Sequence, residues 1–286
     1  MTAHGSRLTA HAVPISLEFF PPKTDEQKAT LEAALPKLKT LKPEYVSVTF
    51  GAGGSTLSYT PETVRHLRDE HGLDAAPHLS CMGGTREEIR KLLEQYKAMG
   101  CRRIVALRGD LPSGMAGYGD FRYASELVQF IRSEADGFFH IEVACYPEMH
   151  PQAGDADADL KNFVAKIKAG ADGAITQYFY NADAYFRFVE DVRKLGVTVP
   201  IVAGVMPILN YARIATFAAR DGIEIPRWVA LKMEGFLDDA ESIRAFGLDV
   251  VTKLCRRLID GGAPGIHFYT LNQSPLSLEI CRRLAG

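Results

Sequence analysis

The sequence lacks the features that mark secreted, membrane-spanning and nucleic-acid-binding proteins. Its five cysteines are scattered and form no C-x-x-C pair, which argues against a disulfide framework or a zinc site and favours buried, reduced thiols. No apolar run approaches the roughly 20 residues that cross a bilayer. The formal net charge of −2 gives no reason to expect nucleic acid or an anionic membrane as a partner. Residues 1–13 lack the apolar core of a signal peptide, so we interpret them as a flexible arm on a cytoplasmic protein.

Several catalytic and metal-binding motifs are also missing. There is no G-x-S-x-G nucleophile elbow, no Walker A loop and no H-E-x-x-H or EF-hand spacing. His78, His150, His267 and the acidic run at residues 155–159 offer possible metal ligands, but their spacing fits none of these motifs. The acidic run comes just before a predicted helix, where carboxylates suit the helix dipole. We therefore predict no metal site.

A strand–helix alternation extends through the whole chain. Of the 286 residues, 47% are hydrophobic, which is enough to form a large core. Helical patterns separate eight short apolar runs, at residues 15–20, 45–50, 75–81, 103–107, 140–145, 173–177, 200–205 and 265–269. Eight strands that alternate with helices predict an α/β protein, a (β/α)₈ TIM barrel formed as one domain by residues 14–286. A doubly wound open sheet is the alternative.

The first of these runs contains a glutamate among apolar residues. Alternation along the strand places Leu17 and Phe19 on one face and Glu18 on the other. Two prolines then end the strand, so Glu18 lies near its carboxyl end. Removal from water disfavours the charged form of such a carboxylate and so raises its pKa. A raised pKa would let the glutamate donate a proton near neutral pH. The alternative is a structural glutamate that is paired with arginine or lysine.

Polar and aromatic residues follow most of the predicted strands. Because barrel active sites form at the carboxyl ends of the strands, these residues predict a site at one rim. They suit a planar heterocyclic ligand that is bound by stacking and by hydrogen bonds to its edges. In chain order they are Glu18, Thr49, His78, Arg108, Gly109, Asp110, Tyr146, Gln177, Met206, Pro207 and Tyr269.

Eight segments in this order resemble the methylenetetrahydrofolate reductase family. They are SLEFFPPK at residues 16–23, VSVTFGAGGS at 46–55, APHLSC at 76–81, IVALRGDLP at 104–112, ACYPEMHP at 144–151, AITQYF at 174–179, GVMPI at 204–208 and HFYTLN at 267–272. Each segment is weakly specific alone, but together they span the chain from the first strand to the last. The resemblance is to the compact bacterial form, which consists of the catalytic barrel only.

The resemblance implies a flavoprotein oxidoreductase of one-carbon metabolism and methionine supply. NADH or NADPH would pass hydride to FAD and leave, and 5,10-methylenetetrahydrofolate would then take the hydride in a ping-pong reaction that gives 5-methyltetrahydrofolate. Glu18 resembles the family's general acid, which protonates folate N10, and Asp110 resembles a second catalytic carboxylate beside flavin and folate. The expected partners are therefore small molecules. The sequence leaves open whether the protein forms a homo-oligomer.

The family match also assigns ligand-binding roles. Gln177, Phe217, Arg213, Tyr269, Leu271 and Gln273 match substrate-binding positions. The positions that match FAD contacts are Thr49, Ala52, His78, Arg108, Gly109, Asp110, Tyr123, Ala124, Tyr146, His150, Asp159, Asn162 and Lys166. Among these, Arg108 and Lys166 suit the pyrophosphate.

This chain departs from the family pattern at three positions. Where bacterial members often have glutamine near the folate tail, this chain has Arg213, and where they have arginine after the final Leu-Asn it has Gln273. Ala165 replaces another basic FAD contact. The rival functions are another FAD barrel oxidoreductase (similar to proline dehydrogenase), a pterin methyltransferase barrel without flavin, and a non-catalytic flavin- or folate-binding homologue.

Overall fold

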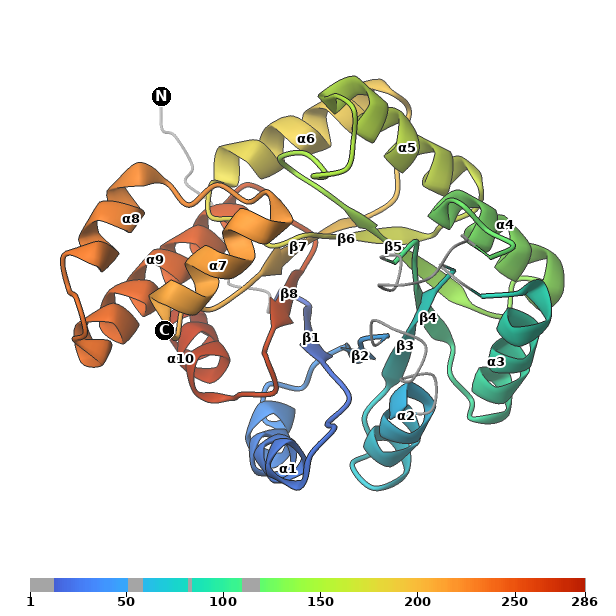
Figure 1. The fold of residues 1–286 in the computed structure, drawn as a ribbon, viewed down its shortest axis with the longest axis horizontal. Helices are drawn as coiled ribbons and strands as arrows, with labels where there is room; N and C mark the ends of the chain where they lie inside the picture. Colours follow the sequence, from blue (N-terminus) through green and yellow to red (C-terminus); the bar gives the residue numbers. More distant parts are fainter. Residues whose placement is uncertain (1–12, 51–58, 82–83, 110–118, 286) are drawn as a thin grey trace, which may run out of the picture.

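A closed barrel of eight parallel strands forms the centre of the protein (Figure 1). The computed structural model describes residues 13–50, 59–81, 84–109 and 119–285. The strands are β1 (Ile15–Phe19), β2 (Tyr45–Val48), β3 (Ala75–Ser80), β4 (Arg103–Leu107), β5 (His140–Cys145), β6 (Gly173–Thr176), β7 (Ile201–Val205) and β8 (Ile266–Tyr269). They pair in chain order, and β8 pairs with β1 to close the ring. This confirms the predicted (β/α)₈ TIM barrel.

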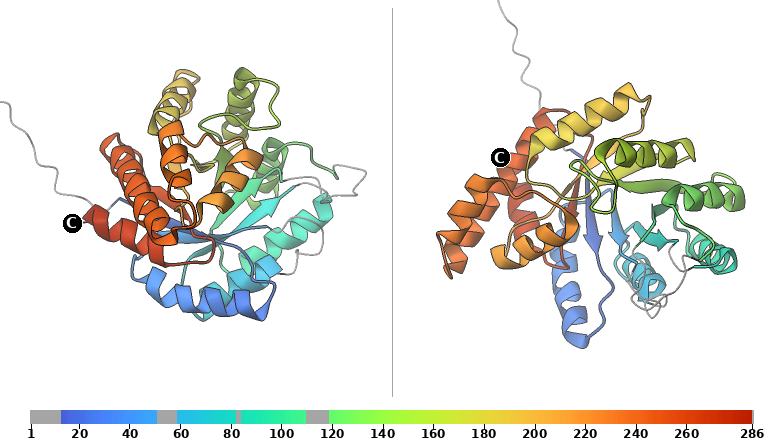
Figure 2. Two further views of the ribbon diagram at one scale, coloured as in Figure 1. Left: turned by 60° about the vertical axis from the view of Figure 1, so that its left-hand side comes forward. Right: turned by 45° about the horizontal axis from the view of Figure 1, so that its top comes forward.

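The helices surround the barrel on its outside (Figure 1). They are α1 (Asp25–Lys39), α2 (Tyr59–Asp69), α3 (Arg86–Ala98), α4 (Ala124–Ala135), α5 (Ala156–Lys168), α6 (Ala182–Lys194), α7 (Tyr211–Asp221), α8 (Arg227–Glu234), α9 (Ala240–Asp260) and α10 (Pro275–Ala285). Three helices, α7, α8 and α9, lie between β7 and β8, and α10 follows β8. Helix α10 packs against α9 and α1 and completes the helical ring (Figure 2).

Local sequence signals explain several helix starts. Thr85 and Glu88 form a capping box at α3, in which each side chain accepts from the other's backbone N–H. Thr24 caps α1 by accepting from the Gln27 N–H. The sequence predicts that Thr60 caps α2, but α2 begins at Tyr59, and the Thr60 hydroxyl donates to the carbonyl of Thr49 at 2.9 Å. This hydroxyl bond ties α2 to the chain that leaves β2.

Strand β1 shows how alternation sorts residues between core and site. Leu17 and Phe19 are buried among the hydrophobic residues of the core, each only 1% exposed. Ser16 and Glu18 lie on the other face, in contact with histidines from β8 and β3. The strand therefore presents its apolar face to the core and its polar face to the barrel interior, as its pattern predicts.

A buried ion pair fills the amino-terminal end of the barrel. Arg103 on β4 donates to Glu142 on β5 at 2.6 Å, and its guanidinium lies 4.2 Å from the centre of the Tyr45 ring on β2. Gly173 on β6 leaves room for this carboxylate, because a Cβ there would lie 2.4 Å from Glu142 Oε2. Residues at this end of a TIM barrel serve stability, whereas the opposite end carries the chemistry.

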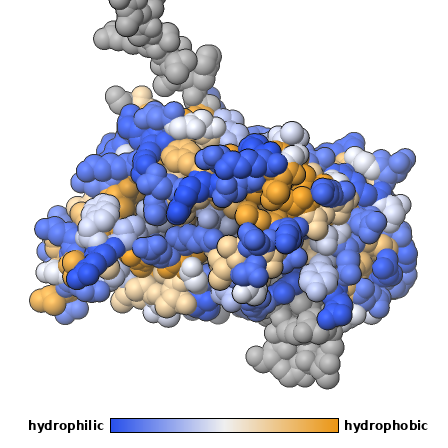
Figure 3. Space-filling model, turned by 90° about the horizontal axis from the view of Figure 1, so that it is seen from above, coloured by the Kyte–Doolittle hydropathy of each residue, from blue (hydrophilic) through white to orange (hydrophobic). Residues whose placement is uncertain are grey.

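The surface is a mosaic of hydrophilic and hydrophobic side chains (Figure 3). Among the described residues, we find no helix whose length and apolarity would let it cross a bilayer. All five cysteines are free and buried, as predicted.

Candidate active site

Glu18 lies in the barrel with two histidines beside its carboxylate. Its Oε2 atom is 3.4 Å from Nε2 of His78 on β3 and 3.7 Å from Nε2 of His267 on β8. The glutamate side chain keeps 17% exposure, whereas the exposure of the His78 and His267 side chains is 7% and 0%. Burial lowers the pKa of His78 to about 4, and the attraction of Glu18 only partly opposes this shift. His78 is therefore neutral at physiological pH.

Among the described residues, no lysine or arginine pairs with Glu18. This disfavours the structural alternative from the sequence, which requires such a partner. A fixed cation would hold the carboxylate ionised, whereas a neutral imidazole does not. Within the described residues, the carboxylate of Glu18 is thus set beside imidazoles and not beside a fixed cation.

Strand pairing places His267 in this group. Its register partner on β1 is Ser16, and the Ser16 hydroxyl and His267 Nδ1 are 2.7 Å apart. The His267 ring packs edge-on against Tyr269 at a centroid distance of 5.3 Å. Within the described part of the chain, neither His267 Nε2 nor His78 Nε2 has a hydrogen-bond partner. Two buried imidazole nitrogens are thus directed to the carboxylate and left for a further partner.

Two further residues, which the sequence analysis did not assign to the site, hold β1 in place. Thr270 donates from its hydroxyl to the Glu18 carbonyl at 2.6 Å. The Asn272 side chain forms two hydrogen bonds with the Phe20 backbone, each 2.9 Å long. Asn272 has a φ of 58°, and Leu271 has a φ of 52°. Asparagine tolerates this left-handed region better than most residues, which is the signal in the sequence that could have identified it.

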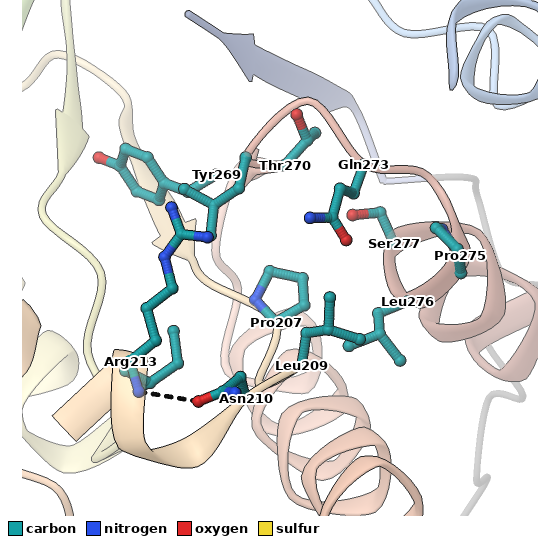
Figure 4. Close-up of a pocket in the computed structure, with 12 residues that line it drawn as sticks. Pro207, Leu209, Asn210, Arg213, Tyr269, Thr270, Gln273, Pro275, Leu276 and Ser277 are labelled. Atoms are coloured by element: carbon teal, nitrogen blue, oxygen red, sulfur yellow. Dashed lines mark hydrogen bonds between the residues drawn. The ribbon is translucent and has the colours of Figure 1, made fainter. Parts of the chain in front are cut away.

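A pocket next to Glu18 collects most of the predicted substrate residues. Four of the six, Arg213, Tyr269, Leu271 and Gln273, line it (Figure 4). In Figure 4, Arg213 extends from α7 on one side, and Gln273 lies on the other. The remaining lining residues are Pro207, Leu209, Asn210, Ile214, Thr270, Pro275, Leu276 and Ser277. The pocket therefore combines apolar walls with a cation and with neutral hydrogen-bonding groups.

Tyr269 connects this pocket to Glu18. The two residues are register partners on β8 and β1, and the Tyr269 hydroxyl donates to the Thr176 carbonyl at 2.8 Å. Gly204 on β7 makes this possible, because a Cβ there would lie 2.1 Å from the same carbonyl oxygen and 2.8 Å from the Tyr269 ring.

The other two predicted substrate residues, Gln177 after β6 and Phe217 on α7, lie outside the lining of this pocket. Gln177 follows β6, and its backbone N–H donates to the Cys145 carbonyl at 2.7 Å. Phe217 on α7 is half-buried between two guanidinium groups, those of Arg213 and Arg220, at 5.2 and 5.1 Å from its ring centre. The ring also packs against the edge of the hydrophobic core.

The two predicted phosphate-binding cations differ in their surroundings. Arg108, after β4, is hydrogen-bonded to Gln152. The amine of Lys166 on α5 is turned inward and donates to the Ala144 carbonyl at 2.5 Å. Burial lowers its pKa. Within the described residues, no carboxylate forms an ion pair with Lys166, so an anionic ligand would compensate its charge.

Three other predicted cofactor residues lie together after β5. Tyr146 packs against His150 at a ring distance of 4.5 Å, and the His150 N–H donates to Asp159 Oδ2 at 2.9 Å. Tyr146 and Asp159 line an open cleft of about 540 Å³ between α5, α6 and the chain after α7. A cleft of this size can accept part of a large cofactor.

The remaining predicted cofactor residues are more dispersed. Thr49 and Gly109 follow β2 and β4, Tyr123 and Ala124 begin α4, and Asn162 lies on the exposed side of α5. Tyr123 is 50% exposed. Asp110 and Ala52, together with residues 1–12 of the predicted arm, lie outside the described residues.

Comparison with known sequences gives one consistent family. Residues 4–285 match the model for methylenetetrahydrofolate reductase. The 5,10-methylenetetrahydrofolate reductase of Escherichia coli (strain K12) is 41% identical over 272 residues, which cover 95% of this chain and 90% of that protein. The Salmonella typhimurium enzyme is 40% identical over the same shares of the two chains. Methylenetetrahydrofolate reductase (NADH) 1 of Arabidopsis thaliana is 35% identical, and the match covers 94% of this chain but only 48% of the plant protein.

A solved structure supports the fold. An uncharacterized protein from Clostridium thermocellum, described as binding two copies of 5-methyl-5,6,7,8-tetrahydrofolic acid, superposes with a TM-score of 0.64 at 16% identity. The superposition covers 96% of this chain and 94% of that one. The matched residues and the level of identity establish that this chain belongs to the methylenetetrahydrofolate reductase family and is an oxidoreductase.

Proposed function

We propose that this protein reduces 5,10-methylenetetrahydrofolate to 5-methyltetrahydrofolate with FAD as its bound cofactor and NADH or NADPH as the donor, in a ping-pong cycle. The observation that carries the proposal is the setting of Glu18. Its carboxylate lies at the mouth of the barrel beside a neutral imidazole and next to an apolar pocket that contains a cation. The family relationship supports this reaction, and the geometry supports Glu18 as its proton donor.

Glu18 would act as general acid toward folate N10. Protonation of that nitrogen breaks the C–N10 bond of the five-membered ring and leaves a 5-iminium cation, which can accept a hydride. His78 stays neutral, so it does not hold the Glu18 carboxylate ionised in the way that a lysine or arginine would. The bonds from Thr270 and Asn272 fix the backbone on both sides of the acid. This restricts its position relative to the substrate.

The residues present fit FAD. When bound, the flavin supplies a carrier that takes up and releases a hydride. The buried Lys166 amine, which forms no ion pair within the described residues, suits a phosphate, and Arg108 adds a second cation. The cleft lined by Tyr146 and Asp159 provides room for the rest of the nucleotide.

Arg213 would hold the carboxylate end of folate. Among the described residues that line the pocket, it is the only cation. In relation to the family pattern, arginine and glutamine have exchanged places between positions 213 and 273. The two positions together supply one cation and one amide in either arrangement, so we infer that Arg213 takes over the recognition of the anionic tail.

The test is an anaerobic mixing experiment on the purified protein, following the visible flavin band. NADH or NADPH should bleach the band, and methylenetetrahydrofolate should restore it. In Glu18→Gln the bleaching should persist, whereas recovery should slow by about 10²–10⁴-fold, the usual effect of removing a general acid.

The two half-reactions serve as controls for each other. Equal loss of both in Glu18→Gln would make Glu18 structural and reject its role as acid. Bleaching without recovery in the wild type would point to another FAD barrel oxidoreductase. Failure of flavin-saturated protein to bleach with either nucleotide would reject the proposed cofactor and donor.

A further inference from the structure

A second cluster of titratable side chains lies on the outside of the barrel, away from Glu18. It joins Glu32 on α1, His66 near the end of α2, and His71 in the turn that leads into β3. Helices α1 and α2 are neighbours on the barrel exterior (Figure 1). The cluster faces the amino-terminal end of β3, whereas the proposed catalytic residues lie at the carboxyl ends of the strands. It is therefore independent of the proposed function.

The three side chains converge on one point. Glu32 Oε1 is 2.5 Å from His66 Nε2, and Glu32 Oε2 is 3.3 Å from His71 Nε2. The two imidazole rings pack edge-on at a centroid distance of 4.9 Å. One ligand atom from each residue can be chosen so that all three lie within 4.8 Å of one another. The ligands of a tetrahedral zinc ion, at 2.0–2.1 Å from the metal, are about 3.4 Å apart. The distance from Glu32 to His71 already matches that spacing, whereas Glu32 Oε1 would have to move away from His66 Nε2 to admit a metal.

Carboxylates face both ring nitrogens of His66. Its Nδ1 lies 3.0 Å from Glu70 Oε1, and its Nε2 faces Glu32. Both ring nitrogens thus face carboxylate oxygens, which a neutral imidazole can satisfy on one side only. His66 Nε2 is hydrogen-bonded to Glu32 Oε1 here, and a metal would replace the shared proton while Nδ1–H keeps its bond to Glu70. Metal-binding histidines commonly have such a carboxylate behind them.

Other charged groups around the cluster leave room for a divalent ion. Lys39 lies nearby, but its amine donates to the His71 backbone carbonyl at 2.6 Å. Within the described residues, neither Glu32 nor Glu70 pairs with lysine or arginine. The Glu32, His66 and His71 side chains are 38%, 24% and 18% exposed. The site is therefore accessible to an ion from solution.

We propose that Glu32, His66 and His71 form a divalent transition-metal site of the zinc type. Three protein ligands leave one position for water, and the metal ties α1 to the turn between α2 and β3. Two imidazoles and one carboxylate select zinc, nickel or copper over magnesium and calcium, which prefer oxygen ligands. Glu70 is the outer carboxylate that orients His66.

The test uses the full chain without an affinity tag, freed of metal with a chelator. Zinc is titrated at pH 7.5 in competition with a chromophoric chelator, and thermal unfolding is recorded with and without zinc. The wild type should bind one zinc ion per chain and unfold at a higher temperature when zinc is present. Because loss of an outer carboxylate alone typically costs 10–100-fold in metal affinity, His71→Ala and Glu32→Gln should each weaken binding by more than about 100-fold. Neither variant should gain thermal stability from zinc.

His140→Ala is the matched control. His140 also faces two carboxylates, Glu142 at 3.0 Å and Asp172 at 3.9 Å. Within the described residues, however, only the cluster on α1 and α2 brings ligand atoms from three such residues within 4.8 Å of one another. This variant should bind zinc like the wild type. Glu32→Gln preserves side-chain shape, so its metal-free unfolding temperature shows whether the fold is intact. Undiminished zinc binding in His71→Ala and Glu32→Gln, or no binding by the wild type at millimolar zinc, would overturn the proposal.

Discussion

Acid should destabilise this protein through His78, by an amount that follows from the burial of this residue. The imidazole is buried, and desolvation is the main cause that lowers its pKa to about 4 in the folded protein. In the unfolded chain, a histidine has a pKa near 6.5. Between pH 6.5 and pH 4, the unfolded state therefore binds a proton that the folded state does not. Folding stability must fall as the pH falls through this window.

The size of the effect follows from the two pKa values. At pH 5 the unfolded state gains a factor of about 30 from protonation of His78, while the folded state gains almost nothing. A factor of 30 corresponds to about 2 kcal/mol of the free energy of unfolding. At pH 7.5 both states are essentially unprotonated at His78, so the term vanishes.

Urea unfolding at pH 7.5 and pH 5 would measure this term. In wild-type protein stripped of small molecules, the free energy of unfolding should fall by about 2 kcal/mol more than in His78→Gln over that interval. Comparing the two proteins cancels most of the contribution of the other titrating groups, whatever stability the substitution itself costs. Equal losses in the two proteins would mean that His78 takes up a proton in the folded state, and the neutral partner of Glu18 would be lost.

Three further predictions concern packing, substrate binding and thiol chemistry. Gly204→Ala should lower the free energy of unfolding by about 1–3 kcal/mol or more and raise the KM for methylenetetrahydrofolate, because the new Cβ collides with the Thr176 carbonyl and the Tyr269 ring. Chemical denaturation and steady-state kinetics would check this, and a variant as stable as the wild type would contradict the close packing. Arg213→Gln should weaken folate binding by about 10-fold or more, since it removes the cation of the pocket, with little change in the reduction of the flavin by NADH. Equal KM values for folate in the variant and the wild type would show that Arg213 does not bind the folate tail. The five cysteines should resist a thiol reagent in the folded protein and should all react after denaturation. Each is buried, and burial raises the thiol pKa, for example to about 12 in Cys81. Rapid labelling without denaturant would refute this prediction.

Local sequence patterns predict the barrel and the face of β1 that carries Glu18. Alternation in this strand separates Glu18 from Leu17 and Phe19, and the structure confirms that separation. The same patterns do not reveal which residues surround the carboxylate. His78 and His267 reach it only because closure of the barrel brings β3 and β8 around β1.

Other parts of the site depend on backbone conformation or on long-range contacts. The left-handed conformation of Asn272 and its bonds to Phe20 follow from the way β8 closes on β1, and no periodicity within residues 267–272 indicates them. The ion pair of Glu142 with Arg103 likewise joins neighbouring strands whose pairing comes from the fold. The role of Asp110 stays a prediction, since that residue lies outside the described part of the chain.

The pairing of β1 with β8 has a consequence for folding of the protein during its synthesis on the ribosome. Glu18 is synthesised long before His267, Thr270 and Asn272, which surround it and hold its strand. Until then β1 has β2 on one side and an open edge on the other, where any extended segment can pair. A nascent chain therefore carries β1 with an exposed edge until β8 has been synthesised. Shielding of that edge, by a chaperone or by fast pairing of β1 with β2, is expected to limit how much active protein a cell obtains.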